Sequence, residues 1–399
     1  MQSHTRIMTC QCPFDFRRSY KRVLRGDTNV GNGTLINKGE DDMTTRRDFI
    51  GGAAGAMAGA AFVGCDLLAP AHVHAQGAPA GRREVVVNGR RVKTVDVHAH
   101  CAFPQAMALM GMKVNPDNLV MGADRIRAMD EQGIDIEALS INPYWYKAER
   151  DVAQAVVKMQ NEKLAELCAA QPDRFVAFAT IALQHPDLAV RQLEEGVKTL
   201  GLRGVSVGSN VEGRELADPV FHPVWAKAEE LGCLVFIHPV RVPELDRRLA
   251  GNGDLTNIIA FPLDTSIALS HLIFEGTLDR FPGLKICASH GGGYLGSYAP
   301  RSDVVCANFP QRCTGAPLKK KPTEYLRQLY YDSIVFTPEA MRHLIAEVGV
   351  SQIVMGSDYP FPWNTAPVDH ILATPGASDA DRAAMLGDTA ARLLGIQPG

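Results

Sequence analysis

The feature that most constrains the fold of this chain is a regular alternation of short apolar runs and longer amphipathic segments from residue 92 onward. The apolar runs are rich in β-branched residues, and the segments between them carry apolar side chains at helical spacing. Strands that are apolar on both faces and separated by helices are typical of a parallel sheet covered by helices. The expected strands are residues 94–97, 134–139, 176–181, 204–207, 234–237, 285–288, 329–333 and 352–355.

Helices are expected between these strands, and their periodicity is clear at residues 152–170, 187–200, 224–231 and 338–348. The last of them starts with Thr337 and Pro338, a good helix start with proline in the first turn. Eight strand–helix units predict a (β/α)8 TIM-like barrel of the α/β class. A doubly wound open sheet is the alternative, although no glycine-rich phosphate loop follows the first strand.

Composition places the chain among ordinary globular proteins. Of its 399 residues, 46% are hydrophobic and 21% are charged, and the formal net charge is −3. This length allows one large domain or two small ones. No basic block stands out, so nucleic acid is not an expected partner.

The N-terminal part is expected to be a targeting segment that does not belong to the fold. Arg46 and Arg47 precede an uncharged, Gly/Ala-rich run at 49–65, and a small-x-small cleavage pattern follows at 73–75. This succession resembles a twin-arginine export signal, with cleavage after Ala75. The expected organisation is therefore an extension or over-called start at 1–42, a signal peptide at 43–75 and a barrel domain at 76–399.

Export predicts a periplasmic protein with no membrane span in the mature chain, and two alternatives stay open. The protein is cytoplasmic if the signal is misread, or lipid-anchored if Cys65 is an attachment site. Six cysteines remain after Ala75, and no CxxC pair occurs among them. Neither a thiolate zinc site nor a disulfide scaffold is therefore indicated. Pairing of Cys306 with Cys313 in the periplasm is left open by the sequence.

Histidine and aspartate side chains occur where predicted strands end. His98 and His100 end the first strand, and their spacing places both imidazoles on one face. The fifth strand delivers His238, the sixth delivers His290 with three glycines after it, and Asp358 follows the eighth. Because a (β/α)8 barrel gathers the carboxyl ends of its strands at one face, these side chains are expected to form a metal site there.

Imidazoles combined with one carboxylate suit a catalytic divalent ion. Three neutral imidazoles and a carboxylate leave coordination positions open for substrate or water. A further histidine just outside that set, His290, is placed to move a proton. Zinc suits imidazole ligands best, and manganese is the alternative. One ion is expected, because the fourth strand, GVSVG, has no lysine, and a lysine there bridges two ions in the binuclear hydrolases of the superfamily that the motifs described next resemble.

The four motifs VDVHAH, FIHP, SHGGG and GSDYPFPW, in this order, resemble the amidohydrolase superfamily. They are most similar to its branch of α-amino-β-carboxymuconate-ε-semialdehyde decarboxylase and related aromatic-acid decarboxylases, over nearly the whole chain after residue 75. The resemblance implies that His98, His100, His238 and Asp358 are metal ligands and that His290 is catalytic. It also implies that Arg301 reaches a substrate carboxylate in the neighbouring subunit, and hence a homodimer.

The leading functional hypothesis is a metal-dependent, non-oxidative carboxy-lyase acting on an aromatic or unsaturated carboxylic acid. In it, Asp358 or water at the metal protonates the carbon that bears the carboxylate. The alternative is a mononuclear hydrolase of a lactone, amide or C–C bond, which uses the same residues. A metal- or ligand-binding protein without turnover ranks last. The aromatic residues 144–146 either wall the substrate pocket or form a packed loop.

Overall fold

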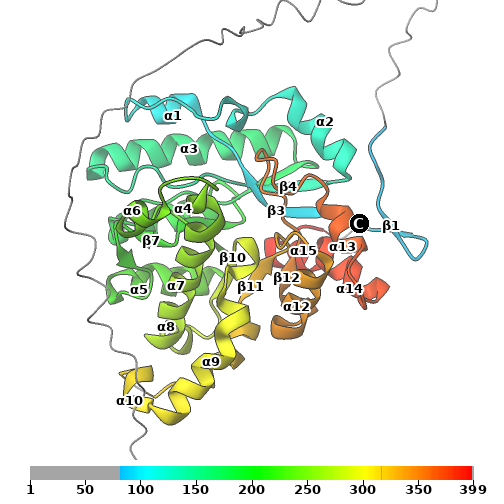
Figure 1. Cartoon of the computed structure of the whole chain (residues 1–399). Coiled ribbons are helices and arrows are strands. Elements are labelled where there is room, and N and C mark those ends of the chain that lie inside the picture. Colours follow the sequence, from blue (N-terminus) through cyan, green and yellow to red (C-terminus); the bar gives the residue numbers. More distant parts are fainter. Residues whose placement is uncertain (1–80, 316, 398–399) are drawn as a thin grey trace, which may run out of the picture. The chain divides into compact units, whose positions relative to one another are not determined.

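The computed structural model describes residues 81–315 and 317–397. All of them belong to one unit, Gln76–Gly399. The extension expected at 1–42, the signal peptide expected at 43–75 and Cys65 lie outside the described residues. Figure 1 shows strands β3, β4, β10, β11 and β12 at the centre of this unit, with helices α3, α4, α7 and α12 around them.

Eight parallel strands of the described chain form the barrel. Three of them pair in the order β3-β4-β5, and five pair in the order β12-β11-β10-β9-β6. In chain order the strands are β3 (Val95–His100), β4 (Ile136–Ser140), β5 (Phe175–Ala177), β6 (Gly204–Gly208), β9 (Leu234–His238), β10 (Lys285–Ala288), β11 (Tyr330–Asp332) and β12 (Ile353–Val354).

Two isolated bridges join the two sets of strands into a closed ring. On one side Ala179, just after β5, pairs with Val205 of β6, and the Ala179 N–H donates to Gly204 O at 2.8 Å. On the other side Asp96 pairs with Met355, and the Val97 N–H donates to Met355 O at 2.9 Å. A ring closed in this way has no free edge, so the TIM-like barrel is confirmed and the open sheet was the wrong alternative.

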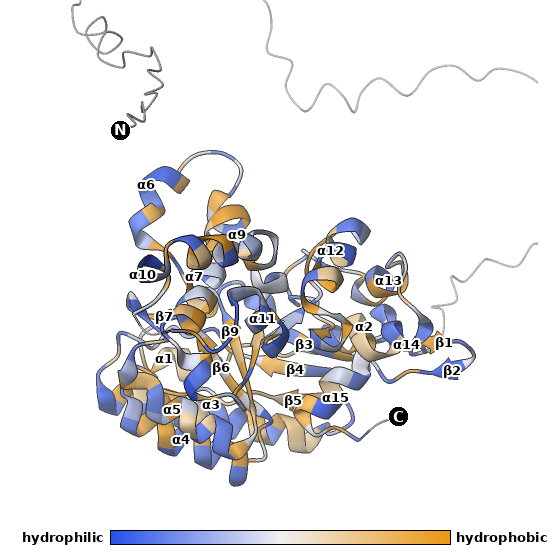
Figure 2. Cartoon of the chain, turned by 90° about the horizontal axis from the view of Figure 1, so that it is seen from below, coloured by the Kyte–Doolittle hydropathy of each residue, from blue (hydrophilic) through white to orange (hydrophobic). Residues whose placement is uncertain are grey.

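The expected helices are present, with boundaries within two residues of the expected ones. They are α3 (Arg150–Ala170), α4 (Pro186–Lys198), α5 (His222–Leu231) and α12 (Pro338–Val348). The Thr337 hydroxyl accepts from the Ala340 N–H at 3.1 Å, which confirms the predicted start of α12. In Figure 2 hydrophilic and hydrophobic residues alternate along α3, α4 and α5, as in amphipathic helices, whereas the central strands are mainly hydrophobic.

The described residues contain further helices and short strands besides those named above. They are β1 (Val86–Val87), β2 (Arg90–Arg91), α1 (Pro104–Ala108), α2 (Ala123–Gln132), β7 (Asn210–Val211), β8 (Arg214–Glu215), α6 (Asp246–Leu249), α7 (Phe261–Phe274), α8 (Thr277–Arg280), α9 (Leu295–Asn308), α10 (Pro310–Cys313), α11 (Pro322–Tyr325), α13 (Pro367–Leu372), α14 (Asp379–Ala383) and α15 (Thr389–Leu394).

Alternate residues of the strands fill the barrel interior. Val97, Ala138, Phe178 and Phe236 belong to one buried cluster, in which the rings of Phe178 and Phe236 stack with centroids 5.6 Å apart. The intervening strand residues face the helices and join a second, larger cluster. Because both faces of each strand are buried, the strands are continuous apolar runs in the sequence.

One helical stretch, Thr256–Phe274, is long and apolar enough to cross a membrane by length and composition alone. It consists of a π-helical turn, Thr256–Ala260, and helix α7. Helix α7 packs against α8 and α9 and buries Leu269, Leu272 and the charged Asp264. These contacts are those of a helix packed against other helices of the fold.

Asp135, just before β4, anchors the N-terminal hairpin β1–β2 to the barrel. It pairs with Arg82, accepts two hydrogen bonds from Arg91 at 2.7 and 3.1 Å, and accepts the Thr94 N–H at 2.8 Å. Burial alone would raise the pKa of Asp135, but the hydrogen bonds and the charges of Arg91 and Arg82 outweigh it and hold this pKa below its ordinary value.

We expect Asp135→Asn to lower the free energy of unfolding at pH 7 by about 1–3 kcal/mol. A lowered folded-state pKa stabilises the fold above the unfolded-state pKa of about 3.9, and this contribution is lost as pH falls through the folded-state pKa. Urea unfolding of the unaltered protein and of Asp135→Asn between pH 7 and pH 3 therefore tests the contribution of the Asp135 carboxylate to stability. The difference between them should shrink below about pH 4, and a difference that stays constant would contradict the assignment.

Candidate active site

Two strand ends of the barrel bring the predicted histidine pair and the predicted aspartate into direct contact. His98 Nε2 and His100 Nε2 are 3.0 Å apart, and Asp358 Oδ1 lies 3.2 Å from the first and 2.9 Å from the second. All three side chains are buried. Three donor atoms that converge in this way, with their other sides packed in the barrel, are suited to surround one cation.

His238 and His290 complete the group of five residues that we call the histidine cluster (His98, His100, His238, His290 and Asp358). One ligand atom from each of His98, His238, His290 and Asp358 lies within 4.8 Å of the others. His290 Nε2 is 3.5 Å from Asp358 Oδ2, and the His290 side chain keeps 15% of its surface exposed. His290 is thus the member that meets solvent.

The HGGG segment forms a left-handed turn that directs His290 toward the cluster. His290 and the three glycines after it all have positive φ, from 54° to 77°. A Cβ atom on Gly292 would lie 2.6 Å from the Tyr331 ring, and one on Gly293 would lie 2.0 Å from Pro262 O. Glycine is therefore required both by conformation and by the close approach of the backbone.

Asp358 is held in the cluster by its backbone as well as by its side chain. Its φ of 64° is unusual for a residue with a side chain, and its N–H donates to His98 O at 2.8 Å. The neighbouring Ser357 donates both its N–H and its hydroxyl to the buried carboxylate of Asp96. Asp96 also accepts the His98 N–H at 3.0 Å. Its carboxylate therefore links the backbone at His98 to the backbone next to Asp358.

The sequence interpretation missed three buried charged residues that support the cluster. Asp332 lies 2.6 Å from His98 Nδ1, and Arg125 donates to His100 O at 2.7 Å and to the buried Glu137 at 2.5 Å. Asp96 is the third. Asp332 carries the same signal as the predicted residues, since it ends the seventh strand. A charged residue inside an apolar strand is the signal for Asp96, whereas Arg125 resembles any exposed helix residue in the sequence.

Burial and the neighbouring charges shift the pKa values of the cluster residues. Burial opposes a positive charge on His98, but Asp358 and Asp332 on its two sides outweigh burial and raise the pKa of His98 to about 10. Burial lowers the pKa of His100 to about 4 and holds that of His238 well below its ordinary value. Burial also opposes ionisation of Asp358, yet the surrounding histidines keep its pKa well below the ordinary range. The cluster thus favours one positive charge among its donors, which fits a bound cation.

Arg301 is not brought into the cluster. It lies in α9, the helix after the HGGG turn, and its side chain is exposed. Tyr298 and Val304 of the same helix and Phe309 just after it are exposed as well, by 68%, 61% and 53%. The role of Arg301 toward a substrate therefore stays a prediction.

Of the three aromatic residues 144–146 after β4, one packs in the core and two line a cavity. Trp145 is fully buried and its Nε1 donates to Ile181 O at 2.9 Å, as in a packed loop. Tyr144 and Tyr146 line a cavity of about 730 Å³ near the end of β9. The sequence interpretation gave no role to Phe361 and Trp363. Their rings stack with centroids 6.5 Å apart, and Phe361 lies 5.7 Å from the His100 ring.

Comparison with known proteins links this geometry to decarboxylases. The chain is 31% identical over 314 residues to 2-amino-3-carboxymuconate-6-semialdehyde decarboxylase of Dictyostelium discoideum, an alignment covering 76% of this chain and 85% of that protein. Among solved structures, 5-carboxyvanillate decarboxylase from Sphingomonas paucimobilis superposes with a TM-score of 0.71 at 26% identity, covering 77% of this chain and 100% of that one.

A further solved structure bears on the cation. A dihydroxybenzoic acid decarboxylase from Polaromonas, solved with bound manganese and the inhibitor 2-nitroresorcinol, has a TM-score of 0.67 at 27% identity, and the match covers 76% of this chain and 97% of that one. Together with the buried imidazole and carboxylate donors, this supports a divalent metal at the histidine cluster. The family model described as Amidohydrolase matches residues 95–396, so this chain belongs to the amidohydrolase family.

Proposed function

We propose that the protein is a metal-dependent, non-oxidative decarboxylase of an aromatic or unsaturated carboxylic acid. The observation that carries the proposal is the histidine cluster itself, in which four imidazoles and one carboxylate meet at the carboxyl ends of the barrel strands. The relatives named above are decarboxylases of acids of this kind. A small-molecule carboxylic acid is therefore the proposed substrate.

His98, His100, His238 and Asp358 are the proposed ligands of a single divalent ion. When bound, such an ion would withdraw electron density from a coordinated carboxylate or phenolate of the substrate. Zinc is our proposal because imidazole donors dominate the set, and manganese is the alternative that the Polaromonas relative supports. Metal analysis of the purified protein distinguishes the two.

Asp358 and His290 are the proposed route of the proton. The reaction exchanges the carboxylate on carbon for a proton, so that the acid becomes CO₂ and a C–H bond. Asp358 Oδ1 faces His98 and His100, whereas Oδ2 faces His290 at 3.5 Å. One carboxylate oxygen is thus free to pass a proton, and the partly exposed His290 can return a proton from solvent.

Arg301 is proposed to bind the anionic end of the substrate across a homodimer interface. Its exposure on α9, beside the exposed apolar residues Tyr298, Val304 and Phe309, supports contact with a second copy of the chain. The guanidinium of an arginine suits bidentate contact with a carboxylate.

CO₂ release tests the proposed reaction. The metal-loaded protein should release CO₂ from at least one member of a panel of hydroxybenzoates, vanillate-type acids and unsaturated dicarboxylates. Removal of the ion with a chelator should lower the rate by about 100-fold or more, and added Zn²⁺ or Mn²⁺ should restore it. A metal-loaded protein that releases no CO₂ from the whole panel would contradict the proposal and turn attention to hydrolysis of lactones and amides.

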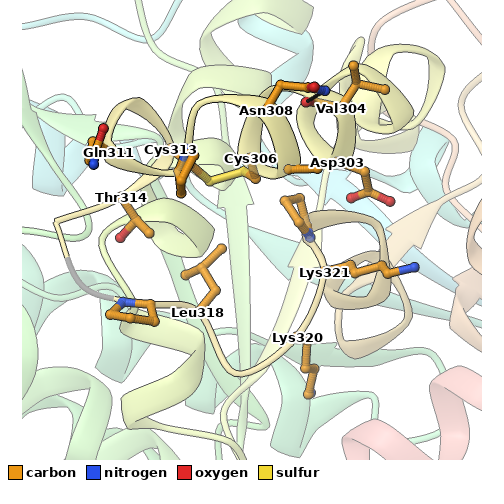
Figure 3. Close-up of a pocket in the computed structure, with 14 residues that line it drawn as sticks. Asp303, Val304, Cys306, Asn308, Gln311, Cys313, Thr314, Leu318, Lys320 and Lys321 are labelled. Carbon is orange, nitrogen blue, oxygen red and sulfur yellow. Dashed lines mark hydrogen bonds between the residues drawn. A yellow bond between two sulfur atoms is a disulfide. The ribbon is translucent and has the colours of Figure 1, made fainter.

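We further propose that the protein is exported to the periplasm by the twin-arginine route. The basic pair and apolar run at 46–65 support this, and so does a disulfide between Cys306 and Cys313 that joins α9 to α10. The disulfide lies beside a cavity of about 850 Å³ (Figure 3). Disulfides persist mainly in oxidising compartments such as the periplasm.

Replacing both Arg46 and Arg47 by lysine is expected to move the protein from the periplasmic to the cytoplasmic fraction and to leave Cys306 and Cys313 reduced. Cell fractionation with thiol labelling measures both effects. Recovery of the unaltered protein in the cytoplasm would overturn the proposal. Recovery in the membrane fraction that is abolished by Cys65→Ser would indicate a lipid anchor instead.

A further inference from the structure

The carboxylate of Asp332 lies behind the histidine cluster, and it contacts residues from two different elements. Its Oδ2 atom is 2.6 Å from His98 Nδ1 and accepts the His290 N–H at 2.9 Å. Its Oδ1 atom accepts the N–H groups of Gly291 and Ile334, at 2.9 and 3.1 Å. Asp332 has no exposed surface. One buried carboxylate therefore connects a ring on β3 with the turn that follows β10.

The contact with His98 decides which of its ring nitrogens carries the proton. A carboxylate only accepts hydrogen bonds, so Nδ1 must carry a hydrogen. In the neutral ring, which is the form that can bind a cation, Nε2 then keeps its lone pair. Nε2 is the atom that faces His100 Nε2 at 3.0 Å and Asp358 Oδ1 at 3.2 Å. A histidine ligand needs this lone pair to be free on the side of the cation.

The contacts with His290 and Gly291 hold the left-handed turn. Both residues have positive φ, 54° and 61°, which is unfavourable for a histidine. Their successive N–H groups point to the two oxygens of Asp332, an arrangement that suits an anion. The strained turn is thus stabilised by the same carboxylate that orients His98.

We propose that Asp332 is a positioning residue for the cation site, which sets the tautomer of His98 and the direction of His290. This inference rests on the cation site of the proposed function, but it does not depend on the reaction catalysed there. Asp332 is not a member of the histidine cluster, because its carboxylate is occupied by His98 and by three backbone N–H groups.

Asp332→Asn tests the tautomer directly. The side-chain amide has one acceptor and one donor group. If its NH₂ group faces His98, the ring must accept at Nδ1 and carry its proton on Nε2. If the NH₂ group faces the turn, it meets the N–H groups of Gly291 and Ile334, which are also donors and are left without an acceptor. We therefore expect 10- to 100-fold weaker Mn²⁺ binding, measured by titration of the metal-free protein and detected by electron paramagnetic resonance.

Two further variants separate positioning from packing. Asp332→Glu restores the carboxylate and should bind Mn²⁺ more tightly than Asp332→Asn, although its extra methylene disturbs the packing more. Asp135→Asn removes a buried carboxylate that lies before β4 and has no contact with the cluster, and should bind Mn²⁺ like the unaltered protein. Asp332→Asn and Asp332→Glu variants with equal affinity would show a packing role only and would overturn the inference.

The outcomes distinguish this inference from the proposed function. If the unaltered protein binds no Mn²⁺, the cation site itself fails, and this inference fails with it. If the unaltered protein binds Mn²⁺ and a folded Asp332→Asn variant binds it equally well, only the role of Asp332 fails. If Asp332→Asn does not fold, Asp332→Glu decides: affinity within about tenfold of the unaltered protein supports the role, and a loss of about 100-fold or more contradicts it.

Discussion

Asp358→Asn is expected to abolish divalent-cation binding and CO₂ release together, with a loss of about 10³-fold or more in kcat/KM. Asp358 supplies the only carboxylate among the five residues of the histidine cluster. It lies 2.9 Å from His100 and 3.2 Å from His98, so a neutral amide would leave the site without its compensating negative charge. The fold should be retained, because the backbone N–H of residue 358 still reaches His98 O.

Metal content by elemental analysis and CO₂ release by steady-state kinetics measure the two effects of Asp358→Asn. Asp369→Asn is a matched control, because this exposed aspartate pairs only with Arg83 among the described residues and lies away from the cluster. It should keep both properties. An Asp358→Asn variant that retains full metal content and activity would show that Asp358 is not a ligand, and the proposed site would have to be redrawn.

His290→Ala is expected to lower turnover by about 10²- to 10⁴-fold while metal content stays near that of the unaltered protein. His290 Nε2 is 3.5 Å from Asp358 Oδ2, and His290 is more exposed than the buried His98. This position suits a group that exchanges protons with solvent better than a group that holds the ion. The expected change is mainly in kcat, since the cation and the substrate carboxylate would still bind.

His343→Ala provides the comparison for His290→Ala, since His343 is exposed on α12 and away from the cluster. It should leave turnover unchanged. The informative opposite result is loss of the ion from His290→Ala. Because His290 belongs to the group of residues whose ligand atoms lie within 4.8 Å of one another, that result would make His290 a ligand and would remove its assignment as the proton donor.

Much of the fold could be predicted because a buried parallel sheet leaves a simple signal. Strand β10 was predicted with its observed bounds, Lys285–Ala288, since apolar side chains are needed on both of its faces. Strand β5 was predicted too long, as residues 176–181 rather than Phe175–Ala177. The chain there stays buried and extended after Ala177, but only Ala179 pairs onward, through an isolated bridge to Val205. Apolar patterning reports burial and does not report where pairing stops.

The histidine cluster could be predicted because the barrel places all strand ends at one face, whatever the loops do. Its supporting residues could not be found in this way. Arg125 is one of several charged residues on α2, and only the packed structure shows that it is buried against Glu137 and His100 O. The sequence likewise carries no signal for the stacking of Phe361 and Trp363, because stacking depends on how the loop after Asp358 turns.

Sequence alone therefore determined the barrel, the residues at its strand ends and the family to which the chain belongs. Each of these depends on local patterns, namely apolar periodicity and short motifs. The tertiary structure decided the pairing of Cys306 with Cys313, the exposed position of Arg301 on α9 and the contact between His98 and Asp332. That contact joins residues 234 positions apart, and such a contact exists only once the closed barrel has brought β3 and β11 to the same site.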